Sequence, residues 1–172
     1  LLHKIAEELL NRNDIHAEYM PQNYEELLQL HVTPVEYLDQ TGKKEERTKI
    51  RTFLGALKYT ADEMDHPIRE LSGGQKAKVL LLKMSLSNAN VLILDEPTRG
   101  IDVGAKYEIY GIMNKLVEMG KSVIMISSEM PELLGMCDRI YVMNEGKIVG
   151  ELEASEATQE LIMSNILKDD QK

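Results

Sequence analysis

The sequence predicts an α/β protein built around a parallel β-sheet. Two unbroken apolar runs, Val91–Leu94 and Val123–Ile126, are typical of strands that are buried on both faces, as they are in a parallel sheet. A helical pattern lies between these two runs, and other helical patterns precede and follow them. This alternation indicates an α/β fold, and an apolar fraction of 43% in 172 residues is enough for the core of one domain.

Two short elements are expected at the start of the chain. Residues 2–12 place their leucine, isoleucine and alanine side chains at helical spacing, with charged residues on the other side, which predicts an amphipathic helix. Residues 15–20 predict a short strand that Pro21 ends.

A charged helical region follows, from residue 34 to about residue 64. Thr33-Pro34 predicts its start, Thr41-Gly42 predicts a break within it, and Pro67 ends it. The mixed-sign cluster at 43–47 is typical of a solvated helix face.

The rest of the chain alternates helices and strands around the two apolar runs. The sequence predicts helices at Lys76 to about Ser87, about Ala105 to Met119, and 131–135. It also predicts a late antiparallel hairpin with strands 139–143 and 147–150 around the turn Asn144-Glu145-Gly146.

Composition narrows the function classes. The net charge of −9 argues against a general grip on nucleic-acid phosphates, so no direct DNA binding is expected. The single cysteine, Cys137, cannot form an internal disulfide, which favours a reducing compartment. No apolar run is long enough to span a bilayer. The chain opens at Leu1 without a leader or a methionine, which predicts a fragment or a trimmed chain.

Two carboxylates follow the first apolar strand directly. Ligands of open α/β sheets bind at the carboxyl ends of the strands. There, Asp95 can hold Mg²⁺ directly or through water, and Glu96 can polarise an attacking water. Two acidic residues after a strand are also typical of a plain turn.

A glycine pair stands at the expected start of the helix that precedes this strand. In Ser72-Gly73-Gly74-Gln75, glycines let backbone N–H groups approach an anion, Ser72 can donate from its hydroxyl, and the helix N-terminus adds positive potential. A flexible helix start is the alternative interpretation of the same residues.

Taken as an ordered set, these features resemble the signature and Walker B motifs of the ABC ATPase family. The set is a Ser-Gly-Gly-Gln helix start, a turn, four apolar residues and Asp95-Glu96-Pro97-Thr98, and the resemblance covers most of the chain. It implies a P-loop-NTPase-like parallel sheet, truncated at the N-terminus, with a helical subdomain. It also implies ATP and Mg²⁺ as cofactors and a dimer with a second ABC ATPase domain, whose nucleotide would meet Ser72, Gly73, Gly74 and Gln75.

The resemblance extends to two further motifs. Tyr19-Met20-Pro21-Gln22 is similar to the Q-loop, whose glutamine, here Gln22, reaches Mg²⁺ and the attacking water. Gly100-Ile101-Asp102 resembles the D-loop, which crosses the dimer interface and here carries Asp102. The resemblance divides the chain into a remnant of the ATPase core with the Q-loop (1–33), a helical subdomain (34–70) and the remaining core (71–172).

One position departs from the family pattern. The family usually has a histidine after the strand that follows the D-loop helix, and there it contacts the γ-phosphate. Ser128 occupies that position in Ile126-Ser127-Ser128-Glu129. A hydroxyl can hydrogen-bond a phosphate but cannot carry charge as imidazole does, so efficient hydrolysis at this chain's own site is in doubt.

A second departure concerns the phosphate-binding loop, Gly-x-x-x-x-Gly-Lys-[Ser/Thr]. The Gly-Lys pairs at Gly42, Gly120 and Gly146 all lack the required preceding glycine. Because the helix at 2–12 looks like the one that follows this loop in the family, the loop is expected just upstream of Leu1.

The two halves of the chain resemble different branches of the family. Tyr19–Tyr24 and Leu71–Met84 look like ABC-F proteins, soluble ATPases that act on the ribosome. Thr98–Lys106 and Ser127–Ile140 are similar to the second nucleotide-binding domain of bacterial sugar-import ATPases. A chimera and a divergent member that mixes both patterns are the two explanations.

The leading hypothesis is an ABC-transporter ATPase subunit or fragment for sugar import. It would be cytoplasmic and peripheral at the inner face of the cell membrane, with membrane permease subunits as partners. An ABC-F factor on the ribosome is the first alternative, which the acidic charge balance disfavours. The second is a non-hydrolysing half that supplies its signature loop to a partner's ATP site.

Overall fold

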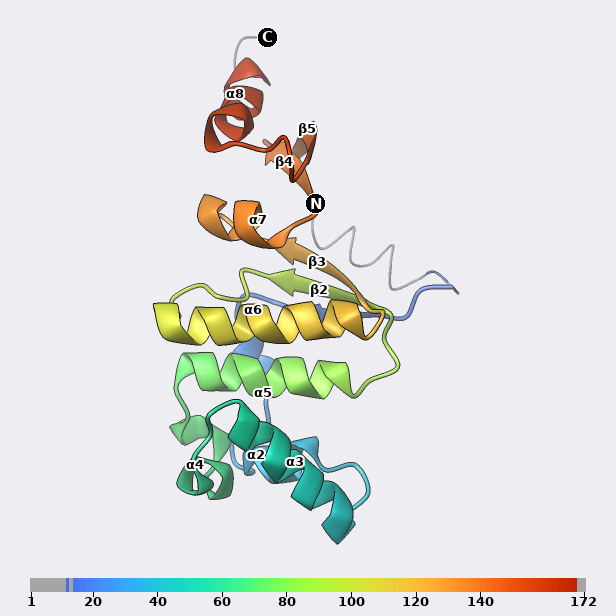
Figure 1. The fold of residues 1–172 in the computed structure, drawn as a ribbon, viewed down its shortest axis with the longest axis vertical. Helices are drawn as coiled ribbons and strands as arrows, with labels where there is room; N and C mark the ends of the chain where they lie inside the picture. The colour runs from blue at the N-terminus through green and yellow to red at the C-terminus, as the bar shows by residue number, and fades with distance from the viewer. Residues whose placement is uncertain (1–11, 13, 170–172) are drawn as a thin grey trace.

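The computed structural model describes residues 12 and 14–169 and shows a three-stranded parallel sheet at the centre of the chain (Figure 1). Its strands are β1 (Ala17–Met20), β2 (Val91–Asp95) and β3 (Ser122–Ile126), with β2 in the middle. Leu94 of β2 is in register with Met20 of β1 and Met125 of β3. The predicted α/β class with a parallel sheet is confirmed. The helix predicted at 2–12 lies outside the described residues.

The two apolar strands differ in burial. In β2, Leu92 and Leu94 are fully buried and Ile93 is 3% exposed, as expected for a central strand. The expectation that β3 is buried on both faces is wrong, because its exposed and half-buried residues alternate and Ile124 is 40% exposed. The reason is position: among the described strands, β3 pairs only with β2 and lies at the edge of the sheet.

Two long helices, α5 (Gly73–Ser85) and α6 (Val103–Glu118), lie side by side next to the sheet (Figure 1). Both begin earlier than the predicted Lys76 and Ala105, because side-chain caps stabilise the helical residues that precede each predicted start. Ser72 caps α5, and the Asp102 carboxylate accepts a hydrogen bond from the first turn of α6. The apolar sides of both helices share one core with the sheet.

The helical lobe at one end of the molecule consists of three helices and two 3₁₀ turns (Figure 1). These elements are η1 (Tyr24–Leu27), α2 (Pro34–Leu38), α3 (Lys44–Ala56), α4 (Ala61–Asp65) and η2 (Ile68–Glu70). The predicted break at Thr41-Gly42 separates α2 from α3. A second break follows α3, where Lys58 adopts the left-handed backbone conformation with φ +66°. Ile50 and Leu54 of α3 belong to the same core as the sheet.

A smaller unit stands at the opposite end of the molecule (Figure 1). Its elements are α7 (Met130–Met136), β4 (Arg139–Asn144), β5 (Lys147–Glu153) and α8 (Gln159–Asp169). The antiparallel pairing of β4 with β5 confirms the predicted hairpin, although β5 extends three residues further. Ile140 and Val142 of β4 and Ile162 of α8 form a second, separate core between the hairpin and α8. The sequence analysis missed α8. The predicted division of the chain into residues 1–33, 34–70 and 71–172 stays a prediction.

Candidate functional site

The carboxyl edge of the central strand carries the first group of predicted site residues. Asp95 ends β2, and the Tyr19 hydroxyl, from the neighbouring strand β1, donates a hydrogen bond to Asp95 Oδ2 at 3.0 Å. Burial and this hydrogen bond raise the pKa of Tyr19, so the phenol stays protonated and orients the carboxylate. Gln22 follows β1 at the same edge and is exposed.

Glu96 is held in place by the loop that follows β3. Its backbone is left-handed, with φ +49°, and its N–H donates to Ile126 O at 2.8 Å. The Ser128 N–H donates to Glu96 Oε1 at 3.0 Å. The structure therefore brings Glu96 and Ser128 together, and the contact uses the backbone of Ser128 rather than its hydroxyl.

The signature segment forms a reciprocal helix cap. The Ser72 hydroxyl accepts a hydrogen bond from the Gln75 N–H at 3.3 Å, and Gln75 Oε1 accepts one from the Ser72 N–H at 2.9 Å. This capping box satisfies two backbone donors at the start of α5. Both side chains thus have a structural role beside the predicted role in nucleotide binding.

The two glycines of this segment are in different surroundings. Gly73 is exposed, and a Cβ built there would meet only the Tyr24 hydroxyl, at 3.9 Å. Gly74 is buried, and a Cβ there would lie 2.6 Å from Ala105 Cβ and 3.2 Å from Ile101 Cγ2. Gly73 is therefore open to a ligand, whereas Gly74 permits close packing of α5 against the start of α6.

Gln75 and Asp102 link this segment to its surroundings. Gln75 Nε2 donates to Glu63 Oε1 of the helical lobe at 2.6 Å. Hydrogen bonds from the Thr60 N–H and from Gln75 lower the pKa of Glu63. Asp102 Oδ1 accepts from the Ala105 N–H at 3.0 Å, so the exposed D-loop aspartate caps α6 beside Gly74.

The predicted site residues thus fall into two groups. Asp95, Glu96 and Ser128, with Gln22 nearby, lie at the carboxyl edge of the sheet. The other group gathers at the adjoining ends of α5 and α6 and consists of Ser72, Gly73, Gly74, Gln75 and Asp102. Within the described part of the chain, no side-chain hydrogen bond joins the two groups.

Comparison with known families decides the assignment. A family model described as ABC transporter matches residues 3–99, which is more than half of the chain. The chain belongs to the ABC transporter family. The matched range contains Gln22, residues 72–75, Asp95 and Glu96.

Curated relatives of this ABC-family chain are named as ATP-binding proteins of sugar transport or sugar import. The L-arabinose transport ATP-binding protein AraG of Geobacillus stearothermophilus is 50% identical over 126 residues, 73% of this chain and 25% of the relative. The xylose import ATP-binding protein XylG of Thermoanaerobacter pseudethanolicus is 58% identical over 111 residues, 64% of this chain and 22% of the relative. The chain therefore spans about a quarter of the length of these relatives.

Solved ABC cassettes share the fold. The dimeric, post-hydrolysis structure of the ATP-binding cassette MJ0796 bound to ADP and Pi has a TM-score of 0.67 and 20% identity, and the match covers 86% of this chain and 67% of the cassette. The ADP conformation of MJ1267 has a TM-score of 0.65 and 24% identity, with 90% and 65% covered. At these identities the likeness shows the fold, which is that of an ABC ATPase cassette.

The residues of the ABC-family chain fit a magnesium ion that is shared with a nucleotide. No group of three or more histidine, cysteine or acidic side chains that could hold a metal alone occurs among residues 12 and 14–169. Mg²⁺ commonly takes one or two protein carboxylates and completes its shell with water and phosphate oxygens. Asp95 can supply one such carboxylate, oriented by Tyr19.

Sequence reasoning missed three polar residues near Glu96. Thr98, Ser127 and Glu132 join in a buried hydrogen-bond cluster beside the Glu96–Ser128 contact. Their burial depends on how two loops and α7 meet, and the only available signal was a glutamate on the apolar side of a short predicted helix.

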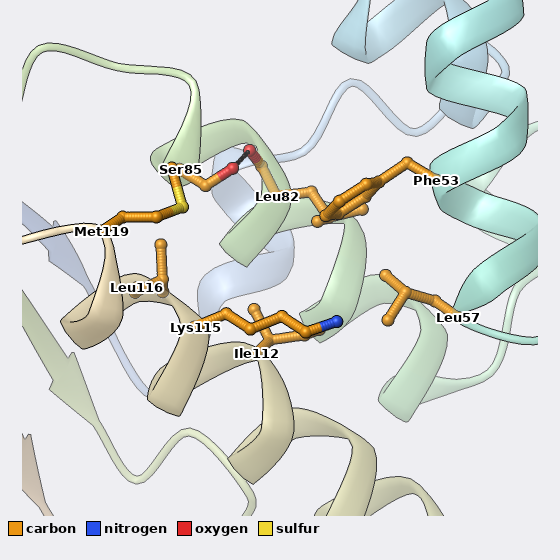
Figure 2. A pocket seen from close by; sticks show the side chains of 8 residues that line it. All are labelled: Phe53, Leu57, Leu82, Ser85, Ile112, Lys115, Leu116 and Met119. Carbon is orange, nitrogen blue, oxygen red and sulfur yellow. Dashed lines mark hydrogen bonds between the residues drawn. The ribbon is translucent and has the colours of Figure 1, made fainter.

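A small apolar pocket lies away from both groups, between α3, α5 and α6 (Figure 2). It is lined by Phe53, Leu57, Leu82, Ser85, Ile112, Lys115, Leu116 and Met119. None of the predicted site residues lines it.

In the described part of the chain, no helix has the length and apolar character needed to cross a membrane.

Proposed function

We propose that the chain is part of an ATPase subunit of an ABC transporter that imports a sugar. The observation that carries the enzymatic part is the carboxyl edge of β2, where Asp95 is held by Tyr19 and Glu96 by the Ser128 N–H. The sugar-import names of the relatives AraG and XylG support the transport part. The subunit would act at the inner face of the cell membrane, with permease subunits and a second ATPase domain as partners.

In the proposed mechanism, Asp95 and Gln22 would hold Mg²⁺, and Glu96 would orient the attacking water. Bound Mg²⁺ would neutralise phosphate charge and align the nucleotide. The Ser128 N–H holds one oxygen of Glu96, so the other oxygen is available to accept a proton from water. The Ser128 hydroxyl is exposed and can donate to a phosphate, but it brings no charge of its own.

The signature segment would serve the nucleotide of the partner domain. Ser72 and the Gly73 backbone are exposed at the N-terminus of a 13-residue helix, where backbone N–H groups and the helix dipole attract anions. Asp102 lies beside them and would cross the same dimer interface. This function in trans requires no phosphate-binding loop within the printed sequence.

Two substitutions distinguish the function in trans, on the partner's nucleotide, from hydrolysis at this chain's own site. The chain is mixed with a sugar-import ATPase domain that has a complete Gly-Lys-Ser/Thr loop, and ATP turnover is measured. Ser72→Arg should abolish the stimulation of the partner, because it blocks the exposed helix N-terminus. Glu96→Gln should leave that stimulation unchanged, since Glu96 acts on nucleotide of its own subunit.

The outcomes have distinct consequences. Stimulation that survives Ser72→Arg would contradict the function in trans. Appreciable turnover by the unmixed chain that disappears in Glu96→Gln would show that the chain hydrolyses ATP alone, contrary to the dependence on a partner. Co-sedimentation with purified ribosomes, but not with membrane vesicles carrying a sugar permease, would favour the ABC-F alternative and contradict sugar import.

A further inference from the structure

A buried carboxylate lies next to the proposed catalytic edge. Glu132 of α7 is only 4% exposed, and charged side chains are seldom buried without partners. Two hydroxyls donate to it: Thr98 Oγ1 donates to Oε1 at 2.7 Å, and Ser127 Oγ donates to Oε2 at 2.5 Å. The Tyr110 hydroxyl lies within hydrogen-bonding reach of Thr98 and Glu132 as well. Both carboxylate oxygens are therefore occupied.

The charge of Glu132 affects its neighbours. Burial and, next, the negative charge of Glu132 raise the pKa of the Tyr110 hydroxyl, and the same two causes raise the pKa of the Cys137 thiol. Both groups stay protonated and neutral beside the carboxylate as a result, so neither adds a second negative charge to the cluster.

The two hydroxyls come from different loops. Thr98 is 1% exposed and lies two residues after Glu96, in the loop that follows β2. Ser127 directly precedes Ser128, in the loop that follows β3, and its hydroxyl also accepts from the Glu129 N–H at 3.0 Å. Glu132 thereby ties the loop that carries Glu96 to the loop that carries Ser128.

The separation of these loops determines the orientation of Glu96. The Ser128 N–H donates to Glu96 Oε1 at 3.0 Å, and hydrogen bonds weaken steeply when distance or angle changes. Without the Glu132 link, the loops keep the backbone hydrogen bond from the Glu96 N–H to Ile126 O but lose the side-chain connection between Thr98 and Ser127. A further tether, from Lys106 to Glu129, is partly exposed and holds the residue that follows Ser128.

We propose that Glu132 is a positioning residue that holds the Glu96 carboxylate toward the attacking water by fixing Thr98 and Ser127. The inference rests on the proposed function of Glu96 as the catalytic base. Glu132 itself touches neither nucleotide nor water, and it acts through the two loops. In the absence of the usual histidine, a backbone N–H held by this cluster orients the base.

The test follows the backbone amide of Ser128 by NMR in the purified chain, without nucleotide. Glu96→Ala gives the chemical shift and the hydrogen-exchange rate of the Ser128 amide when its acceptor, the Glu96 carboxylate, is missing. Thr98→Val removes one hydroxyl from the cluster, and Thr98→Ser restores it. Thr48→Val is the matched control, because the Thr48 hydroxyl donates to Lys44 O on exposed α3 at 2.9 Å.

We expect Thr98→Val to shift the Ser128 amide resonance toward its chemical shift in Glu96→Ala and to speed the hydrogen exchange of this amide about tenfold. Thr98→Ser should return both values to those of the wild type, and Thr48→Val should change neither. An unchanged Ser128 amide in folded Thr98→Val would overturn the proposal. Should Thr98→Val fail to fold, Ser127→Ala removes the other hydroxyl and carries the same expectation.

Turnover provides an independent readout. In a chain joined to an intact phosphate-binding loop, where Glu96 acts on nucleotide of its own subunit, a positioning role predicts that Thr98→Val lowers kcat with little change in KM, because nucleotide contacts are intact. Turnover that Glu96→Ala and Thr98→Val both leave unchanged, together with the expected amide shifts, would contradict the catalytic role of Glu96 alone. Normal amide behaviour would contradict the role of Glu132 whatever the turnover.

Discussion

At the residue scale, Ser128 occupies the position where the sequence analysis expects the family's histidine. In a chain joined to an intact phosphate-binding loop, we expect Ser128→His to raise ATP turnover at least about tenfold, because imidazole can contact phosphate and water together. Ser128→Asn is the control, since it adds a polar side chain that cannot be protonated. Equal turnover in the wild type and Ser128→His, measured under saturating ATP, would contradict this expectation.

The glycine pair provides a second residue-scale prediction. Gly74→Ala places a rigid Cβ 2.6 Å from Ala105 Cβ, so we expect a loss of about 1–3 kcal/mol in the free energy of unfolding from overpacking. Gly73→Ala meets no atom closer than 3.9 Å and should change stability by less than about 1 kcal/mol. Urea unfolding of the two variants checks the contrast, and equal losses would show that packing does not distinguish the glycines.

The residues of the site were predictable only in part. Asp95 and Glu96 follow an apolar strand, and that pattern alone indicates the carboxyl edge of a sheet. The buried carboxylate of Glu132 was not predictable, because its two partners lie 34 and 5 residues away along the chain. The role of Gly74 in packing likewise depends on a contact between two helices.

At the scale of elements, the central strand was predicted correctly and the edge strand was not. Four apolar residues in a row indicate a strand, but they do not reveal how many neighbours it pairs with, which is why Ile124 of β3 is 40% exposed. The starts of α5 and α6 were predicted three and two residues too late, since the capping side chains of Ser72 and Asp102 stabilise an earlier turn. The helix α8 was missed altogether.

The packing of α5 against α6 and the helical lobe includes one buried cation. Lys78 Nζ donates to Glu108 Oε2 at 2.7 Å and to Leu57 O at 3.1 Å, and it lies 4.8 Å from the centre of the Tyr59 ring. Lys58 pairs with the same glutamate at 2.7 Å, but its side chain is 79% exposed. The two lysines therefore allow a buried and an exposed ion pair to the same glutamate to be compared.

We expect Lys78→Gln to lower the free energy of unfolding by about 2 kcal/mol or more, because a buried network loses its charge. Lys58→Gln should cost less than about 1 kcal/mol, since exposed ion pairs contribute little. Both lysines lower the pKa of Glu108, with Lys58 the larger cause, so this stabilisation exists above the ordinary glutamate pKa and disappears as pH falls. Thermal unfolding at neutral and acidic pH measures both effects, and equal losses at neutral pH would contradict the difference in burial.

At the scale of the whole molecule, the part of the chain that the structure describes has two separate cores. The larger core runs from the helical lobe through α5 and α6 to the sheet, and the smaller one contains Ile140, Val142 and Ile162. We expect Ile162→Ala, which truncates a side chain that is 4% exposed, to destabilise its own unit by about 2–4 kcal/mol. Leu161→Ala, on a side chain that is 36% exposed, should have a much smaller effect.

Hydrogen exchange distinguishes local from global opening in these variants. Ile162→Ala should reduce amide protection in β4, β5 and α8 and leave α5 unchanged. A uniform loss of protection over both units would show that the two cores unfold as one.

The close approach of Gly74 to Ala105 also has a genetic consequence. Every amino acid except glycine carries a Cβ, so a change at position 74 can be tolerated only when a second change makes room for it. Ala105→Gly removes the nearest atom, and within the first turn of α6 it should cost no more than about 1 kcal/mol. Ala105→Gly is therefore expected to be a specific suppressor of Gly74→Ala, with the double variant more stable than Gly74→Ala alone by urea unfolding. A suppressor screen that starts from Gly74→Ala should accordingly recover second-site changes in the D-loop and the helix after it, which would reveal an epistatic link between the two motifs.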